Sequence, residues 1–310
     1  MKLLFAVVLL ALGFIMLIKG ADWFVDGSAG IAARFGIPQL VIGLTIVAMG
    51  TSAPEAAVSI TAAMSGNAGI TIGNVIGSNI LNVLLILGIT AVIISVPVQH
   101  STVKWEIPFM LVVTVVLAVL GMSDGSISRL EGVILWALFI VYLLYLLRMA
   151  KNNGNDEEEE KHLPLWKQLL MLVIGIAGIV WGSDLTVDNA TVIAEALGMD
   201  DRLIGLTIVA FGTSLPELVT SVTAARKGKA DIAIGNIVGS NVFNILFVVG
   251  TTALITPVVF KAGFLIDSVV ALVAGLILWF GVMKDHRLKR PVGLVMLAAY
   301  AAYFVYLLLG

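Results

Sequence analysis

Ten long apolar stretches, separated by glycine, proline and charged residues, most constrain what this chain can fold into. They predict helices at about residues 3–20, 38–64, 70–96, 106–122, 130–149, 166–183, 202–225, 231–256, 263–283 and 291–309. One helix needs roughly 20 residues to cross a bilayer, so each stretch is long enough for one span. Only 12% of the 310 residues are charged, against about 25% in an ordinary soluble domain. The sequence therefore predicts an all-α membrane protein with ten transmembrane helices.

Composition excludes several classes of function. The net charge of -2 argues against a nucleic-acid partner, and the absence of cysteine removes disulfides, thiolate metal sites and cysteine nucleophiles. The three histidines, His100, His162 and His286, lie beside expected loops, so imidazole chemistry inside the membrane is not expected. We expect no enzyme and no bound cofactor. The lipid bilayer is the expected partner, and the working expectation is a monomer.

The second half of the chain repeats the first. A shift of 162 positions aligns Gly43–Asn82 with Gly205–Asn244 without a gap, and 25 of these 40 positions are identical. The match extends upstream, where Asp22 aligns with Asp184, so the first apolar stretch corresponds to the sixth and is retained as a span rather than a signal peptide. Each half holds five spans, an odd number, so the second half must enter the membrane from the opposite side. Inverted repeats of this kind are typical of transporters.

The halves and their orientation follow from the charged segments. We predict a first five-helix repeat over 1–150, an acidic linker over 151–163 and a second five-helix repeat over 164–310. The run Asp156–Glu160 makes the linker too polar to pack. With the N-terminus outside, the inner loops hold 14 of the 18 lysines and arginines, and the outer loops hold Lys2, Arg129, Arg202 and Lys261. Because positive loops stay inside, we expect both termini outside a cell membrane and the linker in the cytoplasm.

One motif places a proline and a carboxylate inside an apolar span of each half. It runs Gly-Thr-Ser-x-Pro-Glu, ending at Glu55 in the first half and at Glu217 in the second. Proline lacks an N–H and crowds the carbonyl four residues earlier, so Gly50 and Gly212 should lose their helical partners and both helices should break. Broken helices at corresponding places in two inverted halves indicate a transport site. A buried carboxylate costs several kcal/mol unless it is paired, protonated or bound to a metal.

A second motif, Gly-Asn-x-x-Gly-Ser-Asn-x-x-Asn, follows in each half. Asn74, Ser78 and Asn82 fall at i, i+4 and i+8, which places them along one face of an apolar helix. The second half repeats this stripe with Asn236, Ser240 and Asn244. Carboxylate, amide, hydroxyl and carbonyl oxygens without sulfur or imidazole are ligands for hard cations such as Ca²⁺, Mg²⁺ or Na⁺. Two carboxylates match one Ca²⁺ or two Na⁺, so a site that takes either would couple their movements.

These paired motifs resemble the two alpha repeats of the cation/calcium antiporter superfamily, in its prokaryotic sodium/calcium exchanger branch. The resemblance implies four ion sites around Glu55 and Glu217, and exchange of Na⁺ for Ca²⁺ by alternating access. It also implies electrogenic transport and a moving pair formed by the first and sixth spans. The ligands that it implies are hydroxyls, carbonyls and amides of Thr51, Thr213, Ser52, Ser214, Ser78, Ser240, Asn82, Asn244, Ala48 and Ala210.

Several alternatives stay open from the sequence. Asn244 stands where potassium-dependent relatives carry Asp, so we expect no potassium coupling. A proton/calcium antiporter with the same glutamates is the second choice, and a cation channel or an acid/base membrane enzyme ranks below it. The glutamates could instead be protonated structural carboxyls, and the motif glycines could serve close helix packing. Asn79 and Asn241 could pack or support the site, and Asp22, Asp26, Asp184 and Asp188 are expected near the membrane interface.

Overall fold

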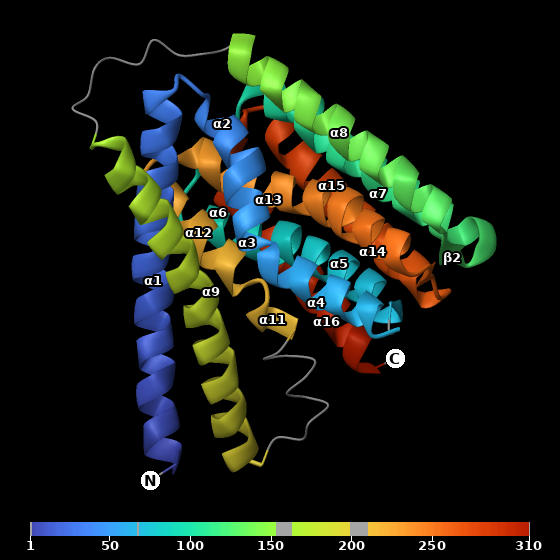
Figure 1. Cartoon of the computed structure of the whole chain (residues 1–310), viewed down its shortest axis with the longest axis horizontal. Coiled ribbons are helices and arrows are strands. Elements are labelled where there is room, and N and C mark those ends of the chain that lie inside the picture. Colours follow the sequence, from blue (N-terminus) through green and yellow to red (C-terminus); the bar gives the residue numbers. More distant parts are fainter. Residues whose placement is uncertain (1, 67, 153–162, 199–209, 310) are drawn as a thin grey trace.

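The computed structural model describes residues 2–66, 68–152, 163–198 and 210–309, and it is almost entirely helical (Figure 1). The first half contains α1 (Lys2–Arg34), α2 (Gln39–Ile42), α3 (Ala48–Thr51), α4 (Ala53–Met64), α5 (Gly69–Ile80), α6 (Leu87–Ile93), α7 (Ile107–Asp124) and α8 (Arg129–Asn152). The second contains α9 (Leu165–Ala196), α11 (Ala210–Gly212), α12 (Leu215–Arg226), α13 (Ala230–Phe243), α14 (Gly250–Ile255), α15 (Gly263–Met283) and α16 (Arg290–Leu309). Single π-helical turns extend several of these helices at Gly43–Val47, Leu81–Ile86, Thr102–Glu106 and Asn244–Val249.

Most of the predicted spans are present. Eight helices of the described ranges are long and apolar enough to cross a bilayer, and the pair Gln39–Thr51 and Ala53–Met64, bent by 49°, makes a ninth if it is counted as one span. The predicted span 202–225 lies partly outside the described residues, which include only α11 and α12 of it. Most of the predicted linker, 153–162, also lies outside them, as does the run Asp156–Glu160. The count of ten spans and their inverted arrangement therefore stay predictions.

Helices α1 and α9 are longer than predicted. The sequence placed their ends near residues 20 and 183, whereas they continue to Arg34 and Ala196. At 1.5 Å per residue α1 is about 50 Å long, more than the roughly 30 Å of a hydrocarbon core. The predicted apolar stretches ended before the aspartates, but α1 and α9 include these aspartates within the helix. Figure 1 shows the two helices side by side, with their lower ends extending beyond the rest of the molecule.

Glycines let α1 and α9 approach closely. A side-chain carbon added at Gly20 would lie 2.8 Å from the carbonyl oxygen of Gly175, and one added at Gly182 would lie 2.8 Å from the amide nitrogen of Leu17. Contacts that early residues of one helix make with late residues of the other show that the pair is antiparallel. Without a hydrophobic driving force in lipid, such backbone contact is a main source of helix association. The pair therefore packs as one tight unit.

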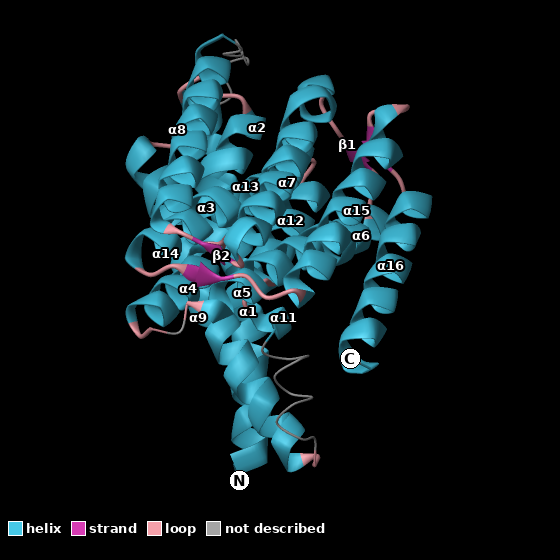
Figure 2. Cartoon of the chain, turned by 90° about the vertical axis from the view of Figure 1, so that its right-hand side faces the viewer, coloured by secondary structure: helices cyan, strands magenta, loops and turns pink. Residues whose placement is uncertain are grey.

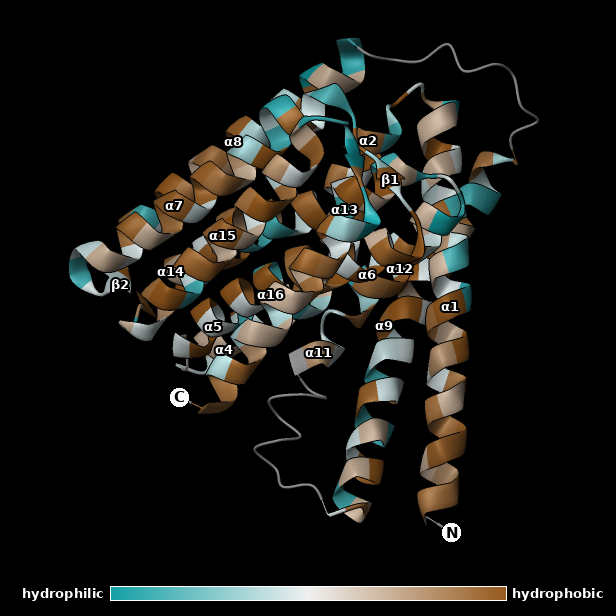
Figure 3. Ribbon diagram, turned by 180° about the vertical axis from the view of Figure 1, so that it is seen from behind, coloured by the Kyte–Doolittle hydropathy of each residue, from teal (hydrophilic) through white to brown (hydrophobic). Residues whose placement is uncertain are grey.

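The core of the molecule is built around α5 and α13. All residues of α13 except Asp231 are buried, although the helix carries several polar side chains. Figure 3 shows that the outer helices, including α1, α7 and α8, are predominantly hydrophobic. Exposed leucines such as Leu130 and Leu147, with 72% and 66% of their surface accessible, match a lipid-facing exterior. The polar residues of the motifs therefore lie inside a shell of apolar helices.

Four two-residue strands were not predicted. They are β1 (Val96–Pro97), β2 (Ser126–Ile127), β3 (Val258–Val259) and β4 (Arg287–Leu288), seen as magenta arrows or short segments in Figure 2. β1 pairs antiparallel with β4, and β2 pairs antiparallel with β3. Each ladder joins the two halves and satisfies backbone groups where helices end. Two residues are too short a run to leave a strand pattern in the sequence.

Candidate functional site

The helix breaks arise where the prolines predict them. α3 ends at Thr51 and α4 begins at Ala53, with Ser52 between them outside the helical region, and Pro54 occupies the first turn of α4. In the second half α12 begins at Leu215, with Pro216 in its first turn. The Gly212 carbonyl, which Pro216 cannot serve, accepts a hydrogen bond of 2.8 Å from the Ser183 hydroxyl of α9. The predicted loss of a helical partner at Gly212 is thus observed, although a hydroxyl and not a cation is the new partner here.

The two glutamates are fully enclosed. Glu55 and Glu217 are 1% and 0% exposed and lie in the first turns of α4 and α12. The Ser52 hydroxyl donates a 2.8 Å hydrogen bond to Oε1 of Glu217. The other Glu217 oxygen and both Glu55 oxygens have no hydrogen-bond partner among the described residues. Three acceptor oxygens of two carboxyls are therefore left for another ligand.

Asparagines of the second motif hold the glutamate backbones. Nδ2 of Asn74 donates to the carbonyl of Glu55 at 3.2 Å and to the Ser59 hydroxyl at 2.9 Å. Asn236 makes the same two contacts, to the carbonyl of Glu217 at 3.4 Å and to the Ser221 hydroxyl at 2.9 Å. Ser59 and Ser221 were not among the residues predicted from the sequence. Both serines lie four residues after a motif glutamate, and serine occupies this position in both halves of the repeat. This identity could have marked them as part of the site.

Asn79 and Asn241 join α5 to α13 at the centre. Each donates its side-chain amide to the backbone carbonyl of the other at 3.1 Å. Their side-chain oxygens accept hydrogen bonds from a further pair of asparagines. Asn82 donates to Oδ1 of Asn241 at 3.0 Å, and Asn244 donates to Oδ1 of Asn79 at 3.2 Å. The side-chain oxygens of Asn82 and Asn244 are buried and without a partner in the described structure. The central pair thus supports the site, while the outer pair leaves two neutral oxygens available.

The hydroxyls of the predicted set are used unevenly. Thr51 donates to Oδ1 of Asn236 at 2.9 Å, and Ser240 donates to the carbonyl of Ala48 at 3.4 Å. The Ser214 hydroxyl is buried with no partner in the described ranges. Ser78 and Thr213 line a cavity of about 430 Å³ that also borders Asn74 and the helices α4, α5, α15 and α16. One side of the site is therefore reached by a cavity.

The second carbonyl ligand of the predicted set stays untested. Ala210 is the first residue of α11, and residues 199–209 before it lie outside the described part of the chain. Its partner in the repeat, Ala48, is buried and accepts hydrogen bonds from the amide of Ser52 at 3.0 Å and from the Thr51 hydroxyl at 3.3 Å. A cation at Ala48 would have to share this carbonyl with donors of its own helix.

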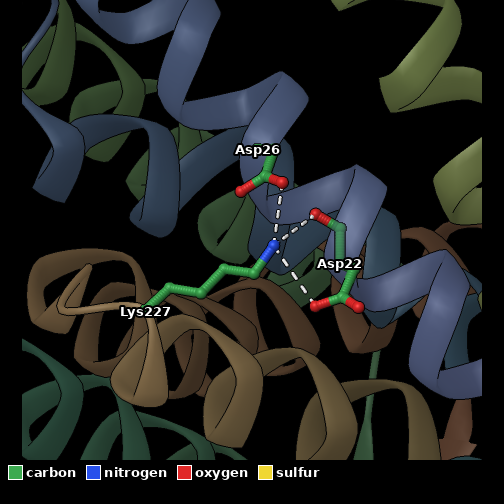
Figure 4. Close-up of polar contacts among 3 residues, drawn as sticks. All are labelled: Asp22, Asp26 and Lys227. Atoms are coloured by element: carbon green, nitrogen blue, oxygen red, sulfur yellow. Dashed lines mark hydrogen bonds and ion pairs between the residues drawn. The ribbon is translucent and has the colours of Figure 1, made fainter.

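The aspartates expected at the interface lie within helices. Asp22 and Asp26 of α1 form ion pairs with Lys227 at the end of α12, at 3.2 and 2.8 Å (Figure 4). Lys227 also donates to the Asp22 carbonyl at 3.1 Å. Their counterparts Asp184 and Asp188 lie in α9, and the residue that corresponds to Lys227 is Ser65. The polar contact between the first helix and the core thus exists in one half of the repeat.

The described oxygens have the chemistry of a hard-cation site. Within the described ranges no three side chains of His, Cys, Asp or Glu gather as a metal cluster. Two carboxyls and the neutral oxygens of serine, threonine and asparagine would have to complete any coordination shell, which is the oxygen chemistry that Na⁺ and Ca²⁺ accept. No lysine or arginine forms an ion pair with either glutamate among the described residues. The site therefore offers negative charge without an internal counter-charge.

Comparison with known proteins shows matches along almost the whole chain. Residues 5–148 and 167–309 match the family model described as sodium/calcium exchanger protein. The putative antiporter CaxA of Alkalimonas amylolytica is 41% identical over 313 residues, covering 97% of this chain and 98% of its own. The sodium/calcium exchanger MaX1 of Methanosarcina acetivorans is 34% identical over 340 residues, covering 96% and 97%. The solved structure of the sodium-calcium exchanger NCX_Mj, soaked with zero Na⁺ and Ca²⁺, is similar with a TM-score of 0.86 and 36% identity, covering 98% of this chain and 99% of that one.

Proposed function

Because the chain belongs to the sodium/calcium exchanger family, whose members are membrane transporters and not enzymes, we propose that it exchanges Na⁺ for Ca²⁺ by alternating access. The observation that carries this proposal is the pair of buried glutamates on two broken helices, with three carboxyl oxygens that no described residue binds. Such a pair is costly in a membrane unless a cation balances it. Ca²⁺ neutralises both charges, and so do two Na⁺.

The proposed ion ligands are ten residues of the two motifs together with Ala48 and Ala210, which lie two residues before the first motif. Glu55 and Glu217 stand at the centre, with neutral oxygens around them. The unpartnered oxygens of Ser214, Asn82 and Asn244 support this assignment, since each is buried and still able to accept a cation. The remaining proposed ligands are Thr51, Thr213, Ser52, Ser78, Ser240, Ala48 and Ala210.

Electrogenic and potassium-independent exchange are further parts of the proposal. If three Na⁺ move for each Ca²⁺, one charge crosses per cycle, which couples transport to about 2.3 kcal/mol per 100 mV. The third Na⁺ would bind neutral oxygens, since the described part of the chain buries two carboxyls in the site, those of Glu55 and Glu217. Asn244 stands where potassium-dependent relatives carry Asp, so its neutral amide supports exchange that is independent of K⁺.

The proposed motion is a slide of α1 and α9 against a fixed core. The close glycine contacts of these two helices support a single moving unit. The reciprocal asparagine hydrogen bonds between α5 and α13 support a rigid core. We place both termini outside the cell membrane and the linker in the cytoplasm, as the distribution of positive charges favours.

Measurement of ⁴⁵Ca²⁺ uptake in vesicles that contain only this protein tests the proposal. Vesicles loaded with Na⁺ and diluted into Na⁺-free buffer should accumulate Ca²⁺, with or without K⁺. An inside-positive potential should accelerate uptake, because three positive charges leave for each two that enter. Uptake that follows only a pH gradient would indicate a proton antiporter, and Ca²⁺ flux without any counter-ion would indicate a channel.

A further inference from the structure

A second buried acid lies outside the glutamate site, in a pocket between the start of α7 and the end of α8. The pocket has a volume of about 240 Å³ and is lined by Trp105, Glu106, Phe109, Val141, Tyr142 and Tyr145. A neighbouring cavity of about 380 Å³ shares Trp105 and Tyr145 and adds Ser101, Arg148 and Asn152. The two cavities together lead from the polar end of α8 to an aromatic interior.

Glu106 brings an unsatisfied carboxyl oxygen to this pocket. Its side chain is 1% exposed, its Oε1 accepts a hydrogen bond from the Tyr145 hydroxyl, and its Oε2 has no partner among the described residues. The Tyr142 hydroxyl, also buried, has no partner there either. No described lysine or arginine forms an ion pair with Glu106. A buried acceptor of this kind requires a donor or a positive charge.

The remaining walls are aromatic. Phe109 and Tyr142 stack with ring centroids 5.4 Å apart and nearly parallel planes. The Trp105 ring already receives a cation, since Nζ of Lys104 lies 5.2 Å from its centroid. Aromatic faces beside a carboxylate attract organic ammonium ions, because the rings stabilise the charge without requiring a hydration shell. Ca²⁺ needs six to eight oxygen ligands and Mg²⁺ six, so a pocket whose oxygens come from one acid and two tyrosines does not suit them.

We propose that this pocket binds an organic ammonium ion, with the positive head beside Glu106 and the apolar substituents against the aromatic rings. The charged groups near the pocket are Lys104, on the Trp105 ring, and Arg148, in the adjoining cavity. Both lie on the Trp105 and Tyr145 side, so the ammonium head occupies the Phe109 and Tyr142 side, where no described cation lies. The site is separate from the proposed exchange function, and its test does not depend on transport.

Choline and 3,3-dimethylbutan-1-ol test the proposal, because they have the same shape and differ in the charge of one atom. Titration calorimetry on the purified full chain should show at least ten-fold tighter binding of choline. Glu106→Gln removes the charge but keeps an acceptor for Tyr145, and it should reduce choline binding at least ten-fold. Glu131→Gln, at the opposite end of α8, is the matched control and should bind choline like the unchanged protein.

Three outcomes would overturn the proposal. Equal binding of choline and its neutral isostere would show that the pocket is merely apolar. Unchanged choline binding in Glu106→Gln would place the binding elsewhere. If Glu106→Gln does not fold, the comparison of choline with its isostere in the unchanged protein still decides whether charge is recognised. Phe109→Leu should also weaken choline binding several-fold, and its failure to do so would locate the ligand outside the aromatic pocket.

Discussion

The two halves of the molecule share their motif residues and the hydrogen bonds of their asparagines, but their glutamate carboxyls and motif serines make different contacts. The Glu217 carboxyl accepts a hydrogen bond from the Ser52 hydroxyl, whereas the Glu55 carboxyl has no hydrogen bond among the described residues, and the hydroxyl of Ser214, the counterpart of Ser52, has none either. A cavity reaches Ser78 in the first half, while its counterpart Ser240 is 0% exposed. The same sequence therefore occupies two environments at once. In an inverted-repeat transporter the halves would exchange these environments when access moves to the other side.

The largest expected effect concerns the feature that both halves share, the buried carboxylate. Glu55→Gln and Glu217→Gln should each reduce Na⁺-driven ⁴⁵Ca²⁺ uptake at least 100-fold, because one remaining carboxylate cannot balance a divalent ion at a buried site. Both substitutions keep the size of the side chain, and in Glu217→Gln the new amide oxygen can still accept from Ser52.

Thermal unfolding of the purified variants checks that loss of uptake is not loss of folding. Glu131→Gln is the control for removal of an acid outside the site. Uptake that survives in one of the two variants would contradict the proposal that both glutamates are ligands of the transported Ca²⁺.

A smaller effect on exchange is expected at the contact between α1 and α9, where equivalent glycines of the two halves pack closely. Gly20 and Gly182 occupy equivalent positions of the repeat, and a carbon added at either would lie 2.8 Å from backbone atoms of the partner helix. Gly20→Ala and Gly182→Ala should each slow exchange about ten-fold, because each forces α1 and α9 apart. Gly69→Ala is the control, since an added carbon there meets no atom within 4 Å. Unequal slowing would show that one helix of the pair moves alone.

The sequence predicted the spans and the breaks because their signals are local. Apolar length located nearly every helix, and Pro54 and Pro216 located the interruptions. The ends of α1 and α9 were wrong because aspartates were treated as loop residues. Asp22 and Asp26 remain helical in a pair with Lys227, a contact between residues about 200 positions apart. No local pattern reports such a contact.

The site was predicted in composition but not in detail. The repeat identified the glutamates and the asparagine stripe, and periodicity placed Asn74, Ser78 and Asn82 on one face. It could not show that Asn79 and Asn241 bind each other across the molecule, since that depends on how α5 and α13 cross. Two identical motifs also predict two identical sites, so the unequal contacts of the halves could only come from the three-dimensional structure.

The contact between Ser183 and Gly212 distinguishes the halves, because alanine stands at position 21, which corresponds to Ser183. Ser183→Ala should destabilise the second break by about 1 kcal/mol, the net value of one hydrogen bond, and slow exchange about five-fold. Ser123→Ala removes a similar hydroxyl-to-carbonyl bond at an exposed position and is the control. Thermal unfolding and ⁴⁵Ca²⁺ uptake measure the two effects. No change in either would mean that the Gly212 carbonyl is equally well served without the serine.

The smallest expected effect concerns Lys227, which ties α1 to α12 in one half and is replaced by Ser65 in the other. Exposed ion pairs contribute at most about 1 kcal/mol each, so Lys227→Met should change the balance of conformations only about two-fold. The chain has no cysteine, so Ile70→Cys, which lines the open cavity, gives a clean labelling site for a membrane-impermeant maleimide.

Labelling of this cysteine should slow about two-fold in Lys227→Met, because the tie stabilises the conformation in which the cavity is open. The difference should shrink at high salt, which screens exposed pairs. Lys289→Met breaks a surface pair with Asp285 that does not involve α1, and it should leave the labelling rate unchanged. Faster labelling in Lys227→Met would show that the ion pairs of Lys227 favour the conformation in which the cavity is closed. These ion pairs, which only one half has, would then destabilise the observed conformation.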